Sequence, residues 1–230
     1  MADSMTEVVQ QEKRAAARSA AALVTTGAVV GLGTGSTAAI AIEELGRRVR
    51  SGEVEDITGV PTSNASHRLG LECGIPIADI ESTPVIDITI DGADEIDPLQ
   101  RVLKGGGGAL LREKIVAART RRWVIIGDST KLVDRLGSRY AVPIEVVRFG
   151  WSGHAEALRE LGAEAVLRQG SGDSPFVTDE GHYIIDARFP HGLDDPEELA
   201  RTMRNRPGVV ETGLFLGFRP EVIIGRAAAE

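Results

Sequence analysis

Four carboxylates lie within seven residues of this chain, where an apolar run ends in the sequence DGADEID: Asp91, Asp94, Glu95 and Asp97. Like charges repel, so such a cluster needs a reason. Calcium is one candidate, but an EF-hand loop spaces its acids at alternate positions, and here Gly92 directly follows Asp91. A magnesium site stays open, although no motif supports it. We expect Asp91 and Asp94 to handle hydroxyl groups and protons, and Glu95 and Asp97 to lie in a solvated turn.

A glycine-rich stretch at 33–37, GTGST, has the composition of an anion-binding loop. Glycines let backbone N–H groups approach an anion, and the helix expected after them adds partial positive charge at its N-terminus. The hydroxyls of Ser36 and Thr37 can donate further hydrogen bonds. The match to a dinucleotide fingerprint is weak, because the acids at about the required ~20-residue distance precede the next expected strand. The lysine of a P-loop is also missing.

A second glycine run, KGGGG at 104–108, is costly to order in regular structure. It is either a flexible hinge or a loop whose backbone contacts a ligand, with Lys104 as a fixed cation. Glu113 follows early in the next expected helix, where its carboxylate can point back toward the loop. A solvated helix face is the alternative for Glu113, and it is the favoured interpretation for Arg112 and Lys114.

Alternating strand and helix patterns must position these groups. Helical patterns extend over 6–25, 37–50 and 109–120, and a further helix ends near Gly74; Ser36 or Thr37 is the expected N-cap of the second helix. Between them, short apolar and β-branched runs predict strands at 28–32, 56–60, 85–90 and 122–127. This alternation is typical of βαβ units and predicts an α/β fold, a mostly parallel sheet flanked by helices in the Rossmann-like manner.

Four loops with unusual composition each follow an expected strand. In a parallel sheet such loops share the edge at the carboxyl ends of the strands, where ligands bind. We therefore expect one site at that edge, built from 33–37, 91–97, 104–108 and 127–131.

The second half of the chain follows a different pattern. Residues 138–206 show a β-α-β-β-α order, which predicts a smaller α+β domain of the ferredoxin-like class. Its last helix has a clear start, with Asp195 as N-cap and Pro196 at the first helical position. The strands after this domain are expected to return to the first domain, which then comprises 1–137 and 207–230.

Composition limits the classes of function. The chain has 230 residues, of which 42% are hydrophobic and 4% aromatic, and its net charge is −8. The acidic balance argues against binding to nucleic acid or to an anionic membrane, and the few aromatic residues argue against a base-stacking platform. A polar N-terminus without the pattern of a signal peptide, and a single cysteine, favour a soluble cytoplasmic protein.

The remaining candidates for chemistry are weak. The four histidines have no metal-ligand spacing, so no metal site is expected from them: His67, His154, His182 and His191. Packing is the expected role of Cys73, and the core or a domain interface is expected for Trp123 and Trp151.

Taken together and in this order, the loops closely resemble those of the ribose-5-phosphate isomerase A family. The matching stretches cover most of the length: VGLGTGSTA, TSNAS, DGADEID, KGGGGALLREK, GDSTK and PGVVETGLF. The resemblance implies a two-domain α/β fold, no cofactor, no required metal, and assembly as a homodimer or homotetramer. It also implies interconversion of D-ribose 5-phosphate and D-ribulose 5-phosphate.

The same resemblance assigns roles to residues of this chain. Glu113 matches the catalytic base, and Asp91, Asp94 and Lys104 match groups that assist catalysis, with Asp91 favoured for opening the sugar ring. Asn64 departs from the pattern, because some members have aspartate there. The substrate-binding positions that match are Lys13, Thr34, Gly35, Ser36, Thr37, Asp91, Gly92, Ala93, Asp94, Lys104, Gly105, Gly106, Gly107 and Lys131.

Two other classes of function stay open at this point. A non-catalytic sugar-phosphate sensor can use the same kind of loops, although no helix-turn-helix extension or basic patch accompanies them here. An acyl-coenzyme-A transferase on a similar fold needs a nucleophilic glutamate. Binding without turnover identifies the first, and sensitivity to hydroxylamine after incubation with acyl-CoA identifies the second.

Overall fold

The computed structural model describes residues 2–172 and 174–227, and it forms two compact units. The first unit comprises the described residues of Met1–Ala93, Arg112–Lys131 and Phe218–Glu230, and the second comprises those of Asp94–Leu111 and Leu132–Gly217. The expected domain limits at residues 1 and 230 lie outside the described residues, as does residue 173 within the expected domain 138–206.

A five-stranded parallel sheet forms the centre of the first unit, as the sequence predicts. The strand order is β12-β6-β3-β1-β2, and each pair of neighbours is parallel. The apolar, β-branched runs supply the strands because their side chains are buried by the helices that alternate with them. The strands are β1 (Val29–Leu32), β2 (Thr58–Pro61), β3 (Ile86–Gly92), β6 (Thr120–Gly127) and β12 (Glu221–Ile224).

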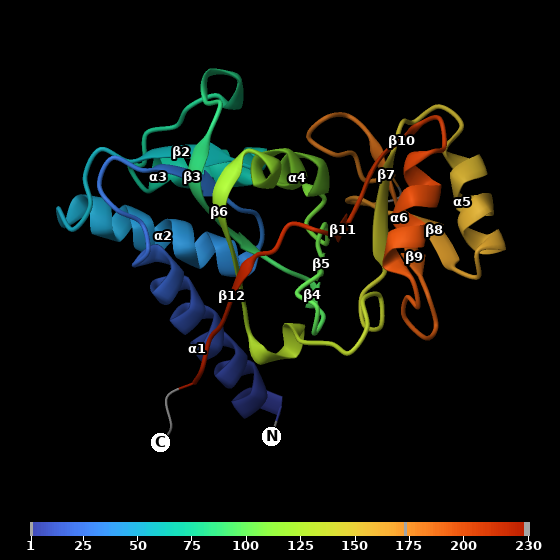
Figure 1. Cartoon of the computed structure of the whole chain (residues 1–230), viewed down its shortest axis with the longest axis horizontal. Helices are drawn as coiled ribbons and strands as arrows, with labels where there is room; N and C mark the ends of the chain where they lie inside the picture. Colours follow the sequence, from blue (N-terminus) through green and yellow to red (C-terminus); the bar gives the residue numbers. More distant parts are fainter. Residues whose placement is uncertain (1, 173, 228–230) are drawn as a thin grey trace. The chain divides into compact units, whose positions relative to one another are not determined.

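Helices cover this sheet, and two of them share one core with it (Figure 1). Small side chains line the buried stripe of the first helix, with Ala16, Ala17, Ala20 and Ala21 all 0% exposed, so this helix packs closely on its neighbours. The unit contains α1 (Ala2–Ala21), α2 (Ser36–Arg50), α3 (Asn64–Glu72), most of α4 (Leu110–Ala118), and the short 3₁₀ turns η1 (Ile80–Ser82) and η2 (Ser129–Lys131).

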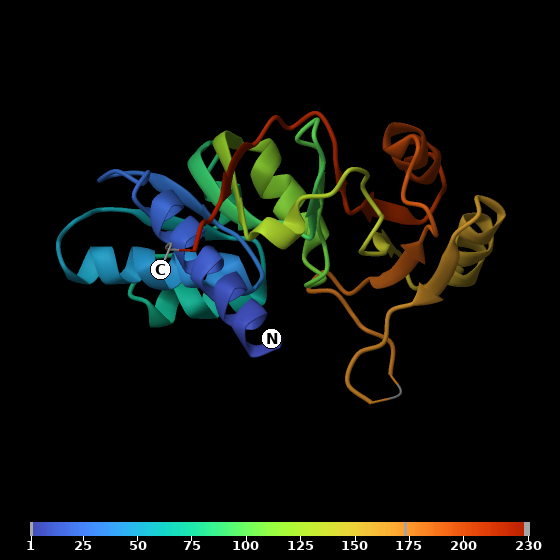
Figure 2. The same ribbon diagram turned by 90° about the horizontal axis from the view of Figure 1, so that it is seen from below.

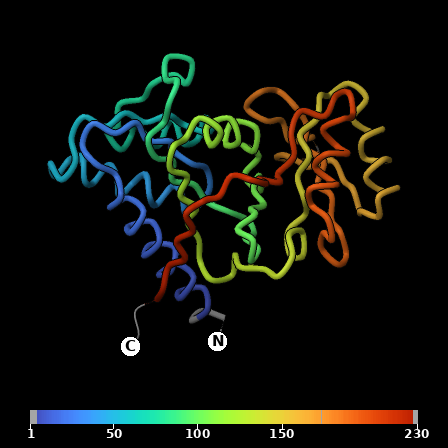
Figure 3. The backbone as a smooth tube through the Cα atoms, in the orientation of Figure 1, coloured from blue at the N-terminus to red at the C-terminus, as the bar shows by residue number. Residues whose placement is uncertain are grey.

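The first helix and the last strand lie side by side within the first unit (Figures 2 and 3). A Cβ atom on Gly225 would lie 1.8 Å from the carbonyl oxygen of Glu12, so only glycine fits at this contact. The end of the chain therefore fixes α1 against the sheet.

The second unit has a four-stranded antiparallel sheet with two helices packed in one core, which confirms the smaller α+β part of the fold (Figure 1). Its strand order is β10-β7-β9-β8. As predicted, Asp195 caps the last helix by accepting the N–H of Glu198 at 2.8 Å. The elements are β7 (Val142–Val146), α5 (Trp151–Glu160), β8 (Glu164–Leu167), β9 (Tyr183–Arg188), α6 (Pro196–Arg204) and β10 (Val209–Thr212).

Two of the expected strand placements are wrong. The segment at 209–212 does not return to the first sheet, because β10 pairs with β7 and completes the antiparallel sheet; the return comes only with β12. The strand before KGGGG is not part of the parallel sheet either. It belongs to a small antiparallel sheet of the second unit, made of β4 (Glu95–Ile96), β5 (Val102–Leu103) and β11 (Leu214–Phe215).

Candidate active site

Three of the four expected loops lie at one edge of the parallel sheet. They follow β1, β3 and β6, which are neighbours in the sheet, at the carboxyl ends of the strands. The fourth, the glycine loop 104–108, follows β5 instead and belongs to the second unit. The expected site residues therefore divide: those in 13–93, Glu113 and Lys131 lie in the first unit, and Asp94 with 104–107 lies in the second.

The loop after β1 is tied to the loop after β3. The backbone N–H of Thr34 donates to Oδ1 of Asp91 at 3.1 Å. A Cβ atom on Gly33 would lie 2.3 Å from that same oxygen and 2.6 Å from the Cα of Asp91, so the backbones of the two segments are in close contact. The hydroxyl of Thr34 lies 2.7 Å from that of Thr62 and 2.8 Å from that of Ser63. Asp91 itself is 0% exposed, and its Oδ1 also accepts the N–H of Gly92 at 2.8 Å.

The start of α2 differs by one residue from the prediction. Gly35 is the N-cap, with a φ of 108° that favours glycine, and Ser36 is the first residue of the helix. The expected capping by Ser36 or Thr37 is wrong, and no side-chain cap is formed here. The exposed hydroxyl of Ser36 instead accepts a hydrogen bond from Nζ of Lys13 at 3.1 Å. A helix N-terminus and a lysine thus combine at an exposed position, which is a favourable place for an anion.

Glu12, next to Lys13, was missed by sequence reasoning. It is buried, and its Oε2 accepts both the N–H and the hydroxyl of Ser129, at 2.9 and 2.8 Å. Ser129 opens the turn that carries Lys131, which is half-buried. Helix α1 therefore holds the loop after β6 through Glu12 and contacts the loop after β1 through Lys13. Nothing in the sequence around Glu12 indicates that its carboxylate is buried and bound to Ser129, because the two residues are 117 positions apart.

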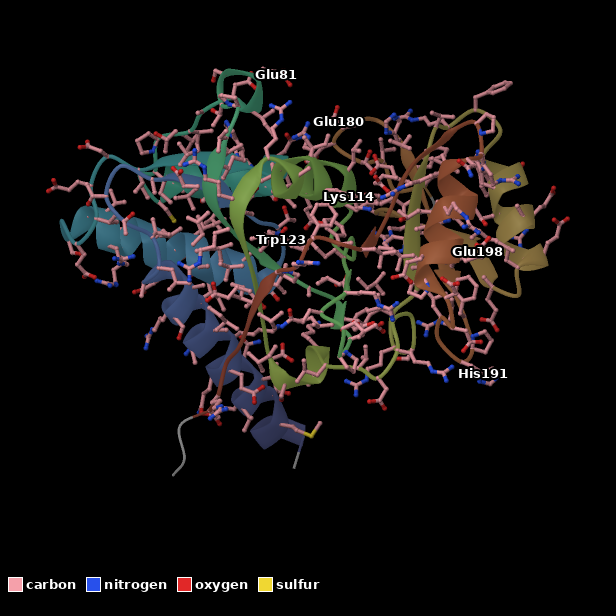
Figure 4. All side chains as sticks on the ribbon, in the orientation of Figure 1. Glu81, Lys114, Trp123, Glu180, His191 and Glu198 are labelled. Carbon is pink, nitrogen blue, oxygen red and sulfur yellow. The ribbon has the colours of Figure 1, made fainter. Side chains whose placement is uncertain are left out.

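Glu113 lies in the first turn of α4 and is 4% exposed, so the solvated-face alternative does not apply to it. The expectation of a solvated position is wrong for Lys114 as well. Lys114, which Figure 4 labels, is only 6% exposed, and the half-buried Arg112 donates to Oδ1 of Asn64 at 3.1 Å. Helix α4 packs on the sheet of this unit through Val116, which clusters with Val60 and Ile86. Asn64 thus accepts from the residue that precedes the expected base.

Within the second unit, Asp94 and the glycine loop are in direct contact. Oδ2 of Asp94 accepts the N–H of Gly106 at 2.7 Å. Lys104 is 2% exposed, and its Nζ lies 5.7 Å from the centroid of the Phe215 ring. The backbone N–H of Lys104 donates to the carbonyl oxygen of Gly213 at 2.9 Å, which fixes the start of the loop.

A cavity of about 330 Å³ opens beside this contact. Its lining includes charged side chains of both signs from the β8–β9 hairpin, Arg168, Asp186 and Arg188, together with Asp94 and Gly106. Gly106 and Gly107 are exposed, so small polar molecules can reach the backbone of the loop.

The other two acids of DGADEID do not lie in a solvated turn, and that expectation is wrong. Glu95 is 0% exposed, and its carboxylate accepts three backbone N–H groups, those of Gly137, Arg139 and Tyr140. Asp97 is 4% exposed and accepts the N–H groups of Leu99 and Arg101 as well as Nε of Arg101 at 2.6 Å. Both carboxylates therefore hold the second unit together.

The weaker candidates are mostly packing residues, as expected. Cys73 is buried at the end of α3, and Trp123 of β6, which Figure 4 labels, is buried too; its ring centroid lies 5.3 Å from that of Phe218. His154 is buried in α5, where desolvation by burial, and secondly Arg206, lower its pKa. Burial raises the pKa of Glu145, although hydrogen bonds from His182 and Thr178 oppose this.

The described part of the chain offers neither a cluster of metal ligands nor a membrane-spanning helix. No group of three or more His, Cys, Asp or Glu residues in it could hold a metal ion. No helix among the described residues is long and apolar enough to cross a membrane.

Comparison with known proteins gives one consistent family. Residues 58–229 match the sequence profile described as ribose 5-phosphate isomerase A (phosphoriboisomerase A). Ribose-5-phosphate isomerase A of Thermosynechococcus vestitus is 45% identical over 220 residues, covering 95% of this chain and 93% of the relative. The protein of the same name from Trichormus variabilis is 44% identical over 214 residues, covering 93% of this chain and 90% of the relative.

Solved structures agree with these relatives. A D-ribose-5-phosphate isomerase in complex with phospho-erythronic acid has a TM-score of 0.91 to this chain at 42% identity, covering 94% of this chain and 95% of that one. Ribose 5-phosphate isomerase A of Methanocaldococcus jannaschii has a TM-score of 0.83 at 41% identity, with 88% of this chain and 89% of that one covered.

Proposed function

The chain belongs to the ribose-5-phosphate isomerase A family, and we propose that it interconverts D-ribose 5-phosphate and D-ribulose 5-phosphate through a cis-enediolate. This aldose–ketose isomerisation belongs to the non-oxidative branch of the pentose phosphate pathway. The buried carboxylate of Glu113 at the start of α4, directly after the sequence KGGGGALLR, is the observation that carries the proposal.

Glu113 is the proposed general base. In the open-chain aldose, its carboxylate takes the proton from C2, the electrons of that bond form the C1–C2 double bond, and the C1 carbonyl electrons move onto O1. The proton then returns from Glu113 to C1, while the hydroxyl proton on O2 moves to O1 and leaves a ketone at C2. Atoms and charge balance, and no external oxidant or reductant is needed.

The proposed role of Lys104 is to stabilise the negative charge that develops on the carbonyl oxygen, together with N–H groups of the glycine loop. Its burial supports this role, because a charge is worth more where water is excluded. Asp91 and Asp94 bind sugar hydroxyls, and Asp91 is the one we assign to proton transfer when the furanose ring opens. Hydrogen bonds from two backbone N–H groups, those of Thr34 and Gly92, hold the carboxylate of Asp91 in one orientation.

The phosphate of the substrate is proposed to bind at the start of α2. The contact between Nζ of Lys13 and Oγ of Ser36, next to the helix N-terminus, supports this placement. Lys131, on the turn that Glu12 holds, is proposed as a second cation for the same phosphate. Binding energy from the phosphate then anchors the sugar for the chemical step.

One experiment tests the reaction directly. Ribose 5-phosphate is added to the protein in deuterium oxide, without metal or nucleotide, and NMR follows ketose formation and deuterium uptake. Ketose formation with deuterium at C1 supports the isomerase, whereas binding without turnover identifies a sensor.

The variant Glu113→Gln tests the base. Turnover should fall by at least ~10²-fold, the usual range for removal of a general base, while substrate still binds. Near-normal turnover in this variant would contradict the assignment. We further propose a cytoplasmic homodimer or homotetramer, which sedimentation at several protein concentrations can test.

A further inference from the structure

The peptide between Gly105 and Gly106 is held on both sides within the second unit. Nη1 of Arg168 donates to the carbonyl oxygen of Gly105 at 2.8 Å, and the N–H of Gly106 donates to Oδ2 of Asp94 at 2.7 Å. These groups belong to one trans peptide, so they point in opposite directions. Arg168 also donates to the carbonyl oxygen of Gly106 at 3.3 Å. The cation lies on the carbonyl side of this peptide and the carboxylate on its N–H side.

Arg168 is itself oriented by its surroundings. Its Nε and Nη2 donate to the two oxygens of Asp186, at 2.9 and 2.5 Å, so the pair has the two-point geometry that resists rotation. Its guanidinium carbon also lies 5.8 Å from the centroid of the Phe176 ring. The side chain is 15% exposed, against 22% for Asp186, so water only partly screens the pair.

A glycine loop needs such support because the planes of its peptide groups rotate easily. Gly105 has a φ of 100°, a conformation open to glycine, and neither Gly105 nor Gly106 has a side chain that would resist rotation of the peptide. If this peptide flipped, its carbonyl oxygen would face the carboxylate of Asp94, and attraction would become repulsion. The guanidinium favours the unflipped peptide and also polarises it, which strengthens the N–H as a donor.

We propose that Arg168, oriented by Asp186, is a positioning residue that fixes the Gly105–Gly106 peptide and thereby holds Asp94 in place for the isomerisation. The inference rests on the proposed function. Arg168 acts through the loop and does not itself take part in the chemistry.

The test compares Arg168→Met and Arg168→Lys with a matched control. Arg148 makes two of the three kinds of contact elsewhere in the second unit: its Nε donates to the carbonyl oxygen of Gly181 at 2.6 Å, and its guanidinium lies 5.4 Å from the Tyr183 ring centroid. Arg168→Met should lower kcat for ribose 5-phosphate by about tenfold or more, since small misplacements of catalytic groups are costly. KM should change less, because the proposed phosphate contacts remain. Arg168→Lys should recover part of the loss, and Arg148→Met should stay within about twofold of the parent.

A second measurement is independent of activity. Hydrogen exchange at the Gly106 amide, followed by NMR, should be faster in Arg168→Met and in the milder variant Asp186→Asn, and unchanged in Arg148→Met. If the parent protein does not isomerise ribose 5-phosphate, the proposed function fails, while the exchange result still decides the role of Arg168 in the loop. Unchanged Gly106 protection in both variants overturns the inference, and so does an equal loss of kcat in Arg168→Met and Arg148→Met.

Discussion

The two glycine loops of this protein are held by different means. GTGST lies between β1 and α2 at the edge of a parallel sheet, and the adjacent strand β3 fixes it: the N–H of Gly33 donates to the carbonyl oxygen of Ile90 at 3.0 Å, and the carboxylate of Asp91 accepts the N–H of Thr34. KGGGG follows a two-residue strand, and side chains bind it, above all Arg168, which is 63 residues from Gly105 in the chain. The first loop is therefore held by the strand beside it, through backbone and side chain together, whereas the middle of the second loop depends on the side chains of Asp94 and the distant Arg168.

The largest difference should appear when each loop receives one methyl group. A Cβ on Gly33 would lie 2.6 Å from the Cα of Asp91, which is backbone and cannot move aside; a Cβ on Gly106 meets only the carboxylate end of Asp94, at 2.7 Å. Gly33→Ala should therefore cost about 3 kcal/mol of unfolding free energy, and Gly106→Ala about 1 kcal/mol. Urea unfolding measures both. Equal costs would show that the two loops are equally rigid.

Two acids of DGADEID that lie in the second unit are expected to have different roles: Asp97 in stability and Asp94 in catalysis. Asp97→Asn should cost about 2 kcal/mol of unfolding free energy, because a buried carboxylate loses part of its charged contact with Arg101. Its kcat should stay close to the parent value at a temperature where it is folded. Asp94→Asn should show the reverse, with a large loss of kcat and a small change in stability. Denaturation curves and initial rates on the same samples decide between these outcomes.

Lys13 tests this difference between the two loops, since it is a single side chain that contacts the first loop. Lys13→Met should raise KM by about tenfold, which corresponds to about 1.4 kcal/mol, while kcat changes little. The neighbouring variant Arg14→Met, at an exposed position of α1, is the control and should leave KM unchanged. A collapse of kcat in Lys13→Met would mean that this loop, too, depends on one side chain.

The smallest effect concerns stability away from both loops. The folded protein disfavours protonation of His154, because burial, and secondly Arg206, lower its pKa. The unfolded chain takes up that proton below its ordinary pKa of about 6.5, so this contribution to stability is present above that pH and is lost as pH falls. When the pH is lowered from about 7.5 to about 5.5, the Tm of the parent should fall further than the Tm of His154→Gln. The difference between the two falls should be less than about 4 °C. The exposed residue His191 gives the control variant His191→Gln, which should follow the parent.

Local patterns in the sequence predicted the elements of the parallel sheet and the loops that follow β1, β3 and β6. Strand, glycine and helix signals stand next to one another there, so the fold class and three of the four loops could be predicted. For Glu113 the local sequence left two interpretations open, a carboxylate that points back toward the glycine loop or a solvated helix face, and its 4% exposure decides against the second.

Long-range contacts explain the failures. Glu95 resembled a surface acid because its three N–H partners lie 42–45 residues further along the chain. Lys114 resembled part of a solvated helix face because nothing local shows that this face is packed. The placement of β10 depends on pairing with β7, and two-residue strands such as β5 give no periodic signal. Nothing near Arg168 indicates that its partner is a glycine loop.

The edge strand β12 has a consequence for how this protein folds. It completes the parallel sheet beside β6, and the ion pair between them joins Arg122 to Glu221, 99 residues apart. Contacts of such separation form late, whereas the sheet of β7 to β10 uses one continuous stretch of chain. Until β12 arrives, β6 is an open edge that carries Val124, Ile125 and Ile126, all 0% exposed in the finished fold. A chain whose synthesis stalls before residue 221 therefore presents an unpaired apolar strand, the form in which aggregation competes most strongly with folding.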